Sequence, residues 1–295
     1  MKKPTEIAVI GAGRMGGAIA RNLAKADFRV TVYDPDPEAR RRCADDGAQV
    51  AESAGQAVTG AELVITSLPM PADVLATVTQ VVEYLTPPTI CMDVSTIDPN
   101  TARKLAGLLE ARGHAFVACP LGKGPSQAEA GESPLFIGGD DDAIQALGDV
   151  FACIGAEQYR LGTVEAATMF KVVSNLIGMT NLAVLAEGYV LCRRAGVTDQ
   201  GFARALADTG AWSYQAELRL PWMMQQDFQP RFATRLGLKD VRLAVDAAAQ
   251  WGIPTPVGAA GMTQLANAVA HGYADLDVNA VLRVLDPEGA VFADA

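Results

Sequence analysis

The chain has few of the residues on which hydrolases, metalloenzymes and disulfide-stabilised proteins depend. It has 2 histidines, His114 and His271, and their wide separation gives no support to a histidine-based triad or a zinc site. Its 5 cysteines include no Cys-x-x-Cys pair, so we expect buried thiols in a reducing compartment. The sequence therefore argues against hydrolytic chemistry and predicts no bound metal.

The chain also lacks a block of basic residues. Its formal net charge is -10, which argues against nucleic acid or an anionic membrane surface as a partner. The apolar run behind Lys2 and Lys3 is too short for a signal sequence and continues into a glycine-rich turn, so we expect a cytoplasmic protein. Hydrophobic residues make up 50% of the chain, enough for the cores of one large or two ordinary domains.

What the chain does have is a glycine-rich turn between a strand and a helix, within IAVIGAGRMGGAIARNLAKADFRVTVYD at residues 7–34. Gly11 and Gly13 allow a tight turn and a close approach of backbone to a pyrophosphate, and Gly16 lets the helix pack near the strand. Asp34 follows about 20 residues later, where a carboxylate accepts bonds from ribose hydroxyls. The pattern predicts a dinucleotide site at Gly11, Ala12, Gly13, Arg14, Met15, Gly16 and Asp34, although such glycines also occur where they only close a turn.

The acidic residue at the end of the second strand favours one cofactor. Asp34 would repel a 2′-phosphate, and Pro35 and Asp36 add no cation beside it, so NAD is favoured over NADP. The run Arg40, Arg41 and Arg42 weakens this preference, but we interpret it as a solvated basic face of the next helix.

Strand-like runs continue through the first half of the chain, at Leu63–Leu68, Thr89–Val94, His114–Ala118 and Leu135–Gly138. Their alternation with helices predicts an α/β fold with a doubly wound parallel sheet, in which ligands bind at the carboxyl ends of the strands. From about Val164 the pattern becomes helical, with one long helix over Glu165–Ala195 and punctuation at Gly196, Gly210, Pro221 and the Pro254/Pro256 pair. We expect an NAD-binding domain at 1–163 and an all-α substrate and dimerisation domain at 164–295.

The loops that follow the strands are rich in small and polar residues. Leu68, Pro69 and Met70 follow the third run, in a loop that we expect to surround the nicotinamide and bind the cofactor. Ser95 and Thr96 follow the fourth, where they could cap the next helix, grip a carboxylate, or do both.

The fifth loop is Gly122-Lys123-Gly124, with glycines on both sides of a cation. It could form a small anion site at the sheet edge, or Lys123 could be an ordinary solvated lysine.

Lys171 and Asn175 are spaced i, i+4 and project from one face of the long helix among apolar residues. Burial would penalise the charged form of the amine and lower its pKa toward the range useful for proton transfer, so Lys171 is the candidate acid/base. The alternative is a helix lysine whose amine reaches solvent. For Lys239 and Asp240, in GLKDVRLAVD, a local ion pair is the simplest interpretation.

These motifs together resemble the β-hydroxyacid dehydrogenase family over essentially the whole chain. GAGRMGGAIARNL resembles its GxGxMGxxxAxNL signature, DVSTIDP its DxSTxxP loop, KVVSN its KxxxN helix and LKD its C-terminal KD element. The resemblance implies a Rossmann domain, a long interdomain helix and a helical domain that pairs with another subunit. It also implies site roles: Lys171 is the general acid/base, Asn175 and Ser95 contact substrate, Thr96 contacts the cofactor and Lys239 helps to close the nicotinamide site.

Two departures from the family pattern concern the substrate. The fifth loop has Gly122-Lys123-Gly124 where the family commonly has Ser-Gly-Gly, which is similar to the sulfolactaldehyde reductase branch and suggests a sulfonate, a phosphonate or a second carboxylate. Glu165 and Ala167 stand where the family has glycines.

The expected activity is reversible NAD-dependent hydride transfer between a small, 3-hydroxyisobutyrate-like acid and its semialdehyde, in a homodimer or homotetramer that needs no metal. Two alternatives stay open: an imine reductase-type enzyme and a non-catalytic NAD-binding regulator. Phosphogluconate dehydrogenase shares the early motifs, but the helical half here is too short for it.

Overall fold

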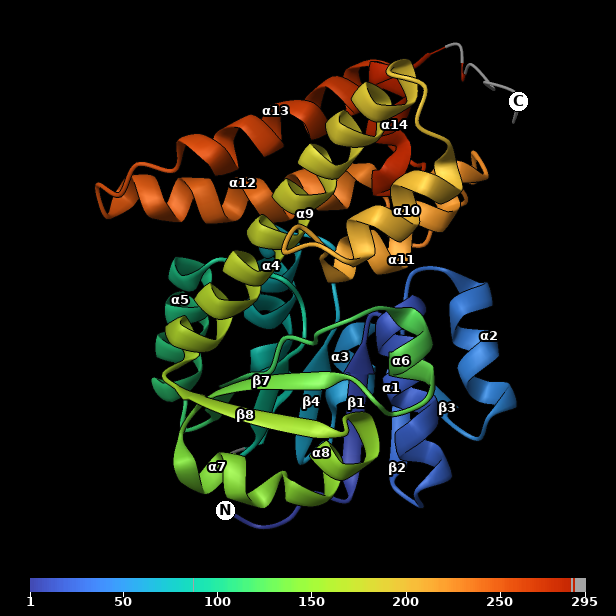
Figure 1. The fold of residues 1–295 in the computed structure, drawn as a ribbon. Coiled ribbons are helices and arrows are strands. Elements are labelled where there is room, and N and C mark those ends of the chain that lie inside the picture. Colours follow the sequence, from blue (N-terminus) through green and yellow to red (C-terminus); the bar gives the residue numbers. More distant parts are fainter. Residues whose placement is uncertain (87, 288, 290–295) are drawn as a thin grey trace. The chain divides into compact units, whose positions relative to one another are not determined.

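The computed structural model describes residues 1–86, 88–287 and 289. The chain divides into two compact units, Met1–Lys171 and Val172–Ala295 (Figure 1). The division falls inside the long helix, a little beyond the domain boundary predicted after residue 163. The predicted functional domains, 1–163 and 164–295, stay a prediction.

Unit 1 contains an eight-stranded sheet in the order β3-β2-β1-β4-β5-β6-β7-β8. The strands are β1 Glu6–Ile10, β2 Arg29–Tyr33, β3 Gln49–Val50, β4 Leu63–Thr66, β5 Ile90–Asp93, β6 Ala115–Ala118, β7 Pro134–Gly139 and β8 Glu157–Gly162. All neighbours are parallel except β6 and β7. The doubly wound α/β prediction is confirmed.

The structure differs from the predicted sheet at both of its edges. β3 has only two residues, both exposed, and β8 reads EQYRLG with almost every residue exposed. Edge strands of this kind carry no hydrophobic signal, so the sequence missed both. β7 runs antiparallel to β6 because the chain turns back beside it, with the Gly122 N–H donating to the Pro134 carbonyl at 2.8 Å.

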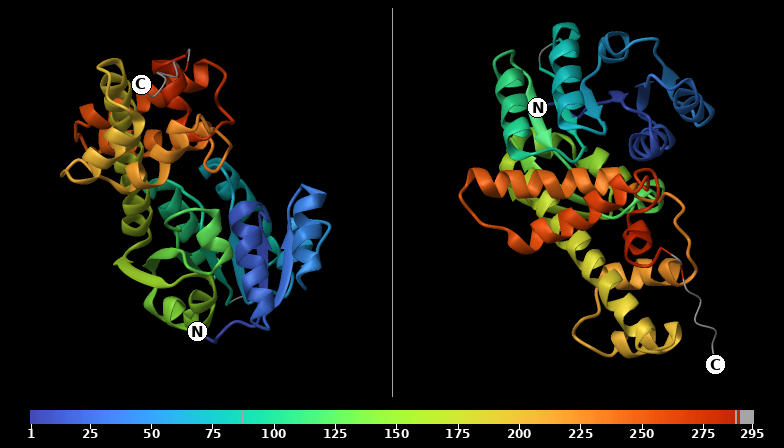
Figure 2. Two further views of the ribbon diagram at one scale, coloured as in Figure 1. Left: turned by 45° about the vertical axis from the view of Figure 1, so that its right-hand side comes forward. Right: turned by 90° about the horizontal axis from the view of Figure 1, so that it is seen from above.

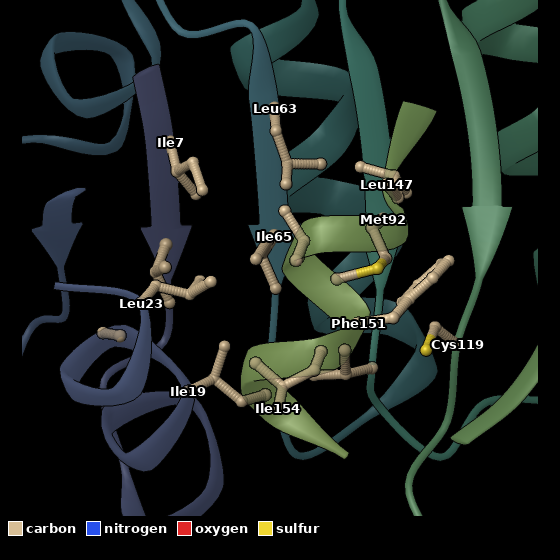
Figure 3. Packing of buried hydrophobic residues seen from close by; sticks show 14 of the residues in the cluster. Ile7, Ile19, Leu23, Leu63, Ile65, Met92, Cys119, Leu147, Phe151 and Ile154 are labelled. Atoms are coloured by element: carbon tan, nitrogen blue, oxygen red, sulfur yellow. The ribbon is translucent and has the colours of Figure 1, made fainter. Parts of the chain in front are cut away.

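Helices cover both faces of the sheet. In unit 1 they are α1 Arg14–Lys25, α2 Pro37–Asp45, α3 Ala54–Val58, α4 Pro71–Val81, η1 Val82–Tyr84, α5 Pro99–Glu110, α6 Pro125–Glu129, α7 Asp141–Ala146 and α8 Gly148–Ile154. Successive strand residues point to opposite faces, so Val9 and Ile65 join one core while Ala8 and Val64 join the other. Figure 3 shows the first core, where Phe151 of α8 packs among the strand side chains.

The strand order places a switch point beside β1. The chain leaves β1 toward β2 on one side, and β4 is the neighbour on the other side. In open α/β sheets ligands bind where the order reverses in this way, outside the carboxyl ends of the strands. The glycine turn after Ile10 and the loop that begins at Ser67 lie at this edge.

Unit 2 is helical among its described residues. Its elements are the later part of α9 Val164–Arg194, then α10 Asp199–Ala207, α11 Tyr214–Met224, α12 Thr234–Gln250, α13 Pro256–Ala270, η2 Val278–Ala280 and α14 Val281–Leu285. α12 and α13 lie side by side (Figure 2). The helical prediction is confirmed, but Pro221 was wrongly taken as helix punctuation, because it lies inside α11.

The long helix predicted from the sequence is α9, with 31 residues. It is long and apolar enough to cross a membrane by length and composition. Leu182, Ala186 and Tyr189, however, are fully buried in the core of unit 2, so this part of α9 is a core helix of a globular unit.

Candidate active site

The glycine turn has the shape that a bound dinucleotide requires. Gly11 has a φ of +91°, and a Cβ there would lie 2.3 Å from the Ser67 carbonyl oxygen. A Cβ on Gly16 would lie 1.9 Å from the Gly11 carbonyl oxygen, so α1 packs directly on the turn. A Cβ on Gly13, in contrast, would meet nothing within 4 Å, and no side chain caps α1. The turn therefore leaves open space at the N-terminus of α1, where a pyrophosphate fits.

Asp34 is held rigidly beside this turn. Its Oδ2 accepts a hydrogen bond from the Ala12 N–H at 2.8 Å, and its Oδ1 accepts one from the Asp36 N–H at 2.8 Å. The carboxylate is thus oriented before any ligand binds, as expected for a group that receives ribose hydroxyls. Within unit 1 the structure brings the predicted residues Gly11, Gly13, Gly16 and Asp34 to one place.

Ser95 joins the loops after β4 and β5. Its hydroxyl donates to Asp93 Oδ1 at 2.7 Å and accepts from the Leu68 N–H at 2.9 Å. Thr66 donates to the same Asp93 oxygen at 2.7 Å. The buried Asp93 therefore organises this edge, a role that the sequence analysis did not assign to it. The alternative that Ser95 or Thr96 caps the next helix is wrong, because Asp98 accepts the capping bond of α5.

The fifth loop places Lys123 in a left-handed conformation. Its φ is 61°, one of three positive values among the described non-glycine residues. The preceding Gly122 packs on an aromatic cluster, since a Cβ there would lie 3.1 Å from Pro134 and 3.2 Å from the Phe136 ring. Phe136 in turn meets Phe170 edge-on with ring centroids 4.7 Å apart. Phe136 thereby connects Gly122 of the loop to Phe170, the α9 residue directly before Lys171.

Lys171 is a buried amine. It is 9% exposed, whereas Phe170 before it is 45% exposed. This burial argues against the alternative in which the Lys171 amine reaches solvent along the helix surface. A lysine at this level of burial is rare unless its amine is paired or functional.

In unit 2 a buried carboxylate organises the other predicted residues. Asp240 is 2% exposed; its Oδ2 accepts from Asn175 Nδ2 at 2.6 Å, and its Oδ1 lies 2.7 Å from Lys239 Nζ. Asp240 therefore links α9 to α12. The local ion pair expected for Lys239 and Asp240 is present, but the sequence did not reveal the bond to Asn175, 65 positions away.

The cysteines are free thiols, as expected. Cys43, Cys91 and Cys119 are buried, and Cys153 and Cys192 are partly buried. Burial raises the pKa of Cys91 to about 12 and also raises that of Cys119, so neither is a reactive thiolate near neutral pH. Within residues 1–86, 88–287 and 289, no three His, Cys, Asp or Glu side chains gather as a metal site.

Two family models together cover most of the chain. The NAD binding domain of 6-phosphogluconate dehydrogenase matches residues 6–168. The NAD-binding domain of NADP-dependent 3-hydroxyisobutyrate dehydrogenase matches residues 166–285. The fold and the site thus define a nicotinamide-dependent oxidoreductase.

Curated relatives are similar to this chain over nearly its full length. A probable 3-hydroxyisobutyrate dehydrogenase from Mycobacterium tuberculosis is 31% identical over 95% of this chain and 98% of its own. An NAD-dependent L-serine dehydrogenase from Pseudomonas aeruginosa is 30% identical over 96% and 98%. A 3-sulfolactaldehyde reductase from Escherichia coli is 29% identical over 94% of each chain.

Solved structures agree with these relatives. The 3-hydroxyisobutyrate dehydrogenase of Mycobacterium tuberculosis with L-serine matches with a TM-score of 0.89 and 30% identity, over 97% of this chain and 100% of that one. An imine reductase from Pseudomonas sp. matches at 20% identity with a TM-score of 0.63, over 96% and 100%, which shows the fold alone.

The chain belongs to the β-hydroxyacid dehydrogenase family. It is an NAD(P)-dependent dehydrogenase or reductase of hydroxy acids, built from a Rossmann domain and a helical domain. The predicted family, enzyme class and nicotinamide cofactor are confirmed, whereas the roles of the individual site residues stay predictions.

Proposed function

We propose that the protein transfers hydride reversibly between NAD(H) and a small acid that carries a hydroxymethyl group, which is oxidised to a semialdehyde. The observation that carries the proposal is the buried Lys171, one helical turn before Asn175. The relatives' names support this substrate class. 3-Hydroxyisobutyrate and L-serine both have a hydroxymethyl group on the carbon that bears a carboxylate.

Lys171 is the proton carrier in this proposal. Bound NAD supplies the acceptor for the hydride that leaves the carbinol carbon. The neutral amine of Lys171 takes the hydroxyl proton during oxidation, and the ammonium returns it to the carbonyl oxygen during reduction. Oxidation requires the neutral form of the amine, and reduction requires its protonated form.

Asn175 orients the alcohol, and Asp240 orients Asn175. A carboxylate only accepts hydrogen bonds, so the Asn175 amide must present its Nδ2 to Asp240. The same Nδ2 carries a second N–H, which can donate to the alcohol oxygen while the single hydroxyl proton goes to Lys171. Fixing this orientation in advance supports a near-attack geometry for the transfer.

The acid end of the substrate is assigned to Ser95, Gly122 and Lys123. Ser95 would contribute its backbone N–H, because its hydroxyl already donates its single proton to Asp93. Lys123 offers a cation on a loop whose left-handed backbone is held between two glycines. Backbone strain of this kind persists where function requires it. A 3-sulfolactaldehyde reductase among the relatives supports a sulfonate, phosphonate or second carboxylate as the extra acid group.

Replacement of Lys171 tests the catalytic proposal. We expect Lys171→Ala to lower kcat by about 10²-fold or more, because proton transfer from the hydroxyl loses its acceptor. The dissociation constant of NADH, measured by fluorescence titration, should stay within about twofold of wild type. A variant that retains its kcat would contradict the proposal.

Lys123→Ala tests the anion site separately. With a substrate that carries a sulfonate or a second carboxylate, kcat/KM should fall about tenfold or more. With a monocarboxylate such as 3-hydroxyisobutyrate the loss should be smaller. Equal losses for the two substrates, or no loss, would contradict an anion site at Lys123.

Two other activities share this architecture. Imine reductases resemble this fold but usually carry Asp or Tyr where Lys171 stands, so a panel of cyclic imines with NADPH should give no turnover. A non-catalytic regulator would bind NAD without turning over any hydroxy acid. The same NADH absorbance assay, run over hydroxy acids, semialdehydes and imines, separates all three functions.

We also propose that the enzyme is a cytoplasmic homodimer or homotetramer with no nucleic acid or membrane partner. Ile177, Val184 and Leu191 recur every seven residues on one face of α9 and are 56%, 59% and 70% exposed. Apolar side chains in such a row favour contact with another subunit. Light scattering should give a multiple of the chain mass, and a monomer at micromolar concentration would contradict it.

A further inference from the structure

The three arginines in α2 do not form the uniform basic face that the sequence suggested. Arg41 pairs with Glu38, 2.9 Å away, and lies 3.9 Å from Asp45, both exposed residues of the same helix. Arg42 is exposed. Arg40 is half-buried, and its Nη1 donates to the Asp34 carbonyl oxygen at 2.8 Å. One arginine of the three therefore turns back to the end of β2.

This contact places a cation next to the ribose-binding carboxylate. The Asp34 side chain is fixed by the Ala12 and Asp36 N–H groups, while the main chain of the same residue holds the Arg40 guanidinium. The other acids of this segment are engaged elsewhere: Asp36 accepts from the Glu38 N–H, and Glu38 pairs with Arg41. Among the residues that the structure describes, Arg40 forms no ion pair with a carboxylate, so no acidic side chain there neutralises its charge.

A 2′-phosphate would meet both groups. Asp34 repels it, because two negative charges would share one site. An arginine guanidinium offers several N–H donors in a planar fork that suits a phosphate, and only one of these N–H groups is needed for the Asp34 carbonyl. Asp34 therefore disfavours binding of a 2′-phosphate, and Arg40 favours it.

We propose that Arg40 forms a latent 2′-phosphate subsite, and that the Asp34 carboxylate alone keeps the enzyme selective for NAD. The inference rests on the proposed role of Asp34 in ribose binding. It goes beyond that role, since it makes Arg40 a specificity-determining residue and assigns the subsite a ligand, the 2′-phosphate of an adenosine nucleotide.

The test uses two nucleotides that cannot react, 5′-AMP and 2′,5′-ADP, with binding measured by calorimetry. The wild-type enzyme should bind 5′-AMP more tightly than 2′,5′-ADP. Asp34→Asn should tighten 2′,5′-ADP binding about tenfold or more, because the repulsion is removed and Arg40 remains. Adding Arg40→Ala to Asp34→Asn should abolish that gain while changing 5′-AMP binding by no more than about twofold.

Arg41→Ala is the matched control, because it removes the same charge from the same helix. In the Asp34→Asn background it should leave the 2′,5′-ADP gain intact. Arg40→Lys should keep part of the gain, since the charge remains but the planar fork is lost. The gain should also shrink as salt rises, whereas 5′-AMP binding changes less across the same range.

The inference is overturned if the gain survives Arg40→Ala, if Arg41→Ala abolishes it equally, or if Asp34→Asn produces no gain. Loss of both nucleotides in the Arg40→Ala double variant also overturns it, because Arg40 would then only support the end of β2. None of these measurements involves turnover, so the result stands apart from the catalytic proposal for Lys171.

Discussion

The two units of this enzyme hold their functional side chains by different means. In unit 1 the glycine turn is anchored by backbone groups at the ends of strands, as when Asp34 accepts the Ala12 N–H, and one buried carboxylate, Asp93, holds Ser95. In unit 2 the anchors are buried charged side chains, among them Asp240 and Asp277, which are 2% and 0% exposed. The comparison teaches that a parallel sheet brings ligand-binding groups together at neighbouring strand ends, whereas a helical unit does so through side-chain pairs between helices.

The largest expected effect tests whether unit 2 depends on buried charge. Asp277 accepts the Phe232 N–H at 2.8 Å and lies 3.4 Å from the buried Arg219 guanidinium. Burial lowers the pKa of Arg219 and Asp277 partly offsets this, so the arginine depends on its partner. Asp277→Ala should lower the free energy of unfolding by about 3–5 kcal/mol in urea titrations.

The control for this variant is Asp275→Ala, which breaks the exposed pair with Arg235. It should cost less than about 1 kcal/mol. Similar losses for the two variants would mean that burial does not distinguish the charges of unit 2.

The second effect separates packing from ligand binding in unit 1. Gly16→Ala should lower the free energy of unfolding by about 1–3 kcal/mol, because its Cβ would lie 1.9 Å from the Gly11 carbonyl oxygen. Gly13→Ala should unfold like wild type, since its Cβ meets nothing within 4 Å, but it should weaken NADH binding by filling the space over the turn. A Gly13→Ala enzyme with unchanged NADH affinity would contradict a pyrophosphate site there.

The third effect concerns the long-range pair that holds Asn175. Asp240→Asn should lower kcat by about 10-fold to 10²-fold, because an amide at 240 no longer fixes which way the Asn175 amide faces. The exposed Asp246→Asn, on the same helix, should change nothing. Rates and melting temperatures should be measured together, since a kcat loss that only follows a collapse in melting temperature would indicate a merely structural Asp240.

The smallest effect is a pH dependence in unit 1. Glu62 accepts the Thr5 N–H at 2.7 Å and pairs with Lys2, and these contacts lower its pKa from 4.5 to about 2. A carboxyl with a lowered folded-state pKa stabilises the fold above pH 4.5, and this contribution disappears as the pH falls toward 2. Glu62→Gln should cost no more than about 1 kcal/mol at pH 7, given the exposure of the pair, and less at pH 2.5. If Glu62→Gln lowers the free energy of unfolding as much at pH 2.5 as at pH 7, the lowered pKa of Glu62 is contradicted.

Local motifs made much of unit 1 predictable. The spacing of Gly11, Gly13 and Gly16 and the position of Asp34 identified the dinucleotide turn, because each residue acts through backbone geometry nearby in sequence. The edge strands β3 and β8 were not predicted from the sequence, since exposed strands have no hydrophobic pattern. The role of Asp93, which ties Thr66 and Ser95 together at the sheet edge, was not predicted either, because Thr66 ends a different strand, 27 positions away.

The sequence by itself determined the fold class, the nicotinamide cofactor and the long helix with Lys171 and Asn175 on one face, because these follow from period, turn chemistry and spacing along the chain. Only the tertiary structure decided which charged side chains are buried and which residues they contact. Arg40 and Arg41 are neighbours in sequence, yet one contacts Asp34 and the other Glu38. Asn175 and Asp240 are 65 positions apart, yet they share a hydrogen bond, since contacts between elements depend on how those elements pack.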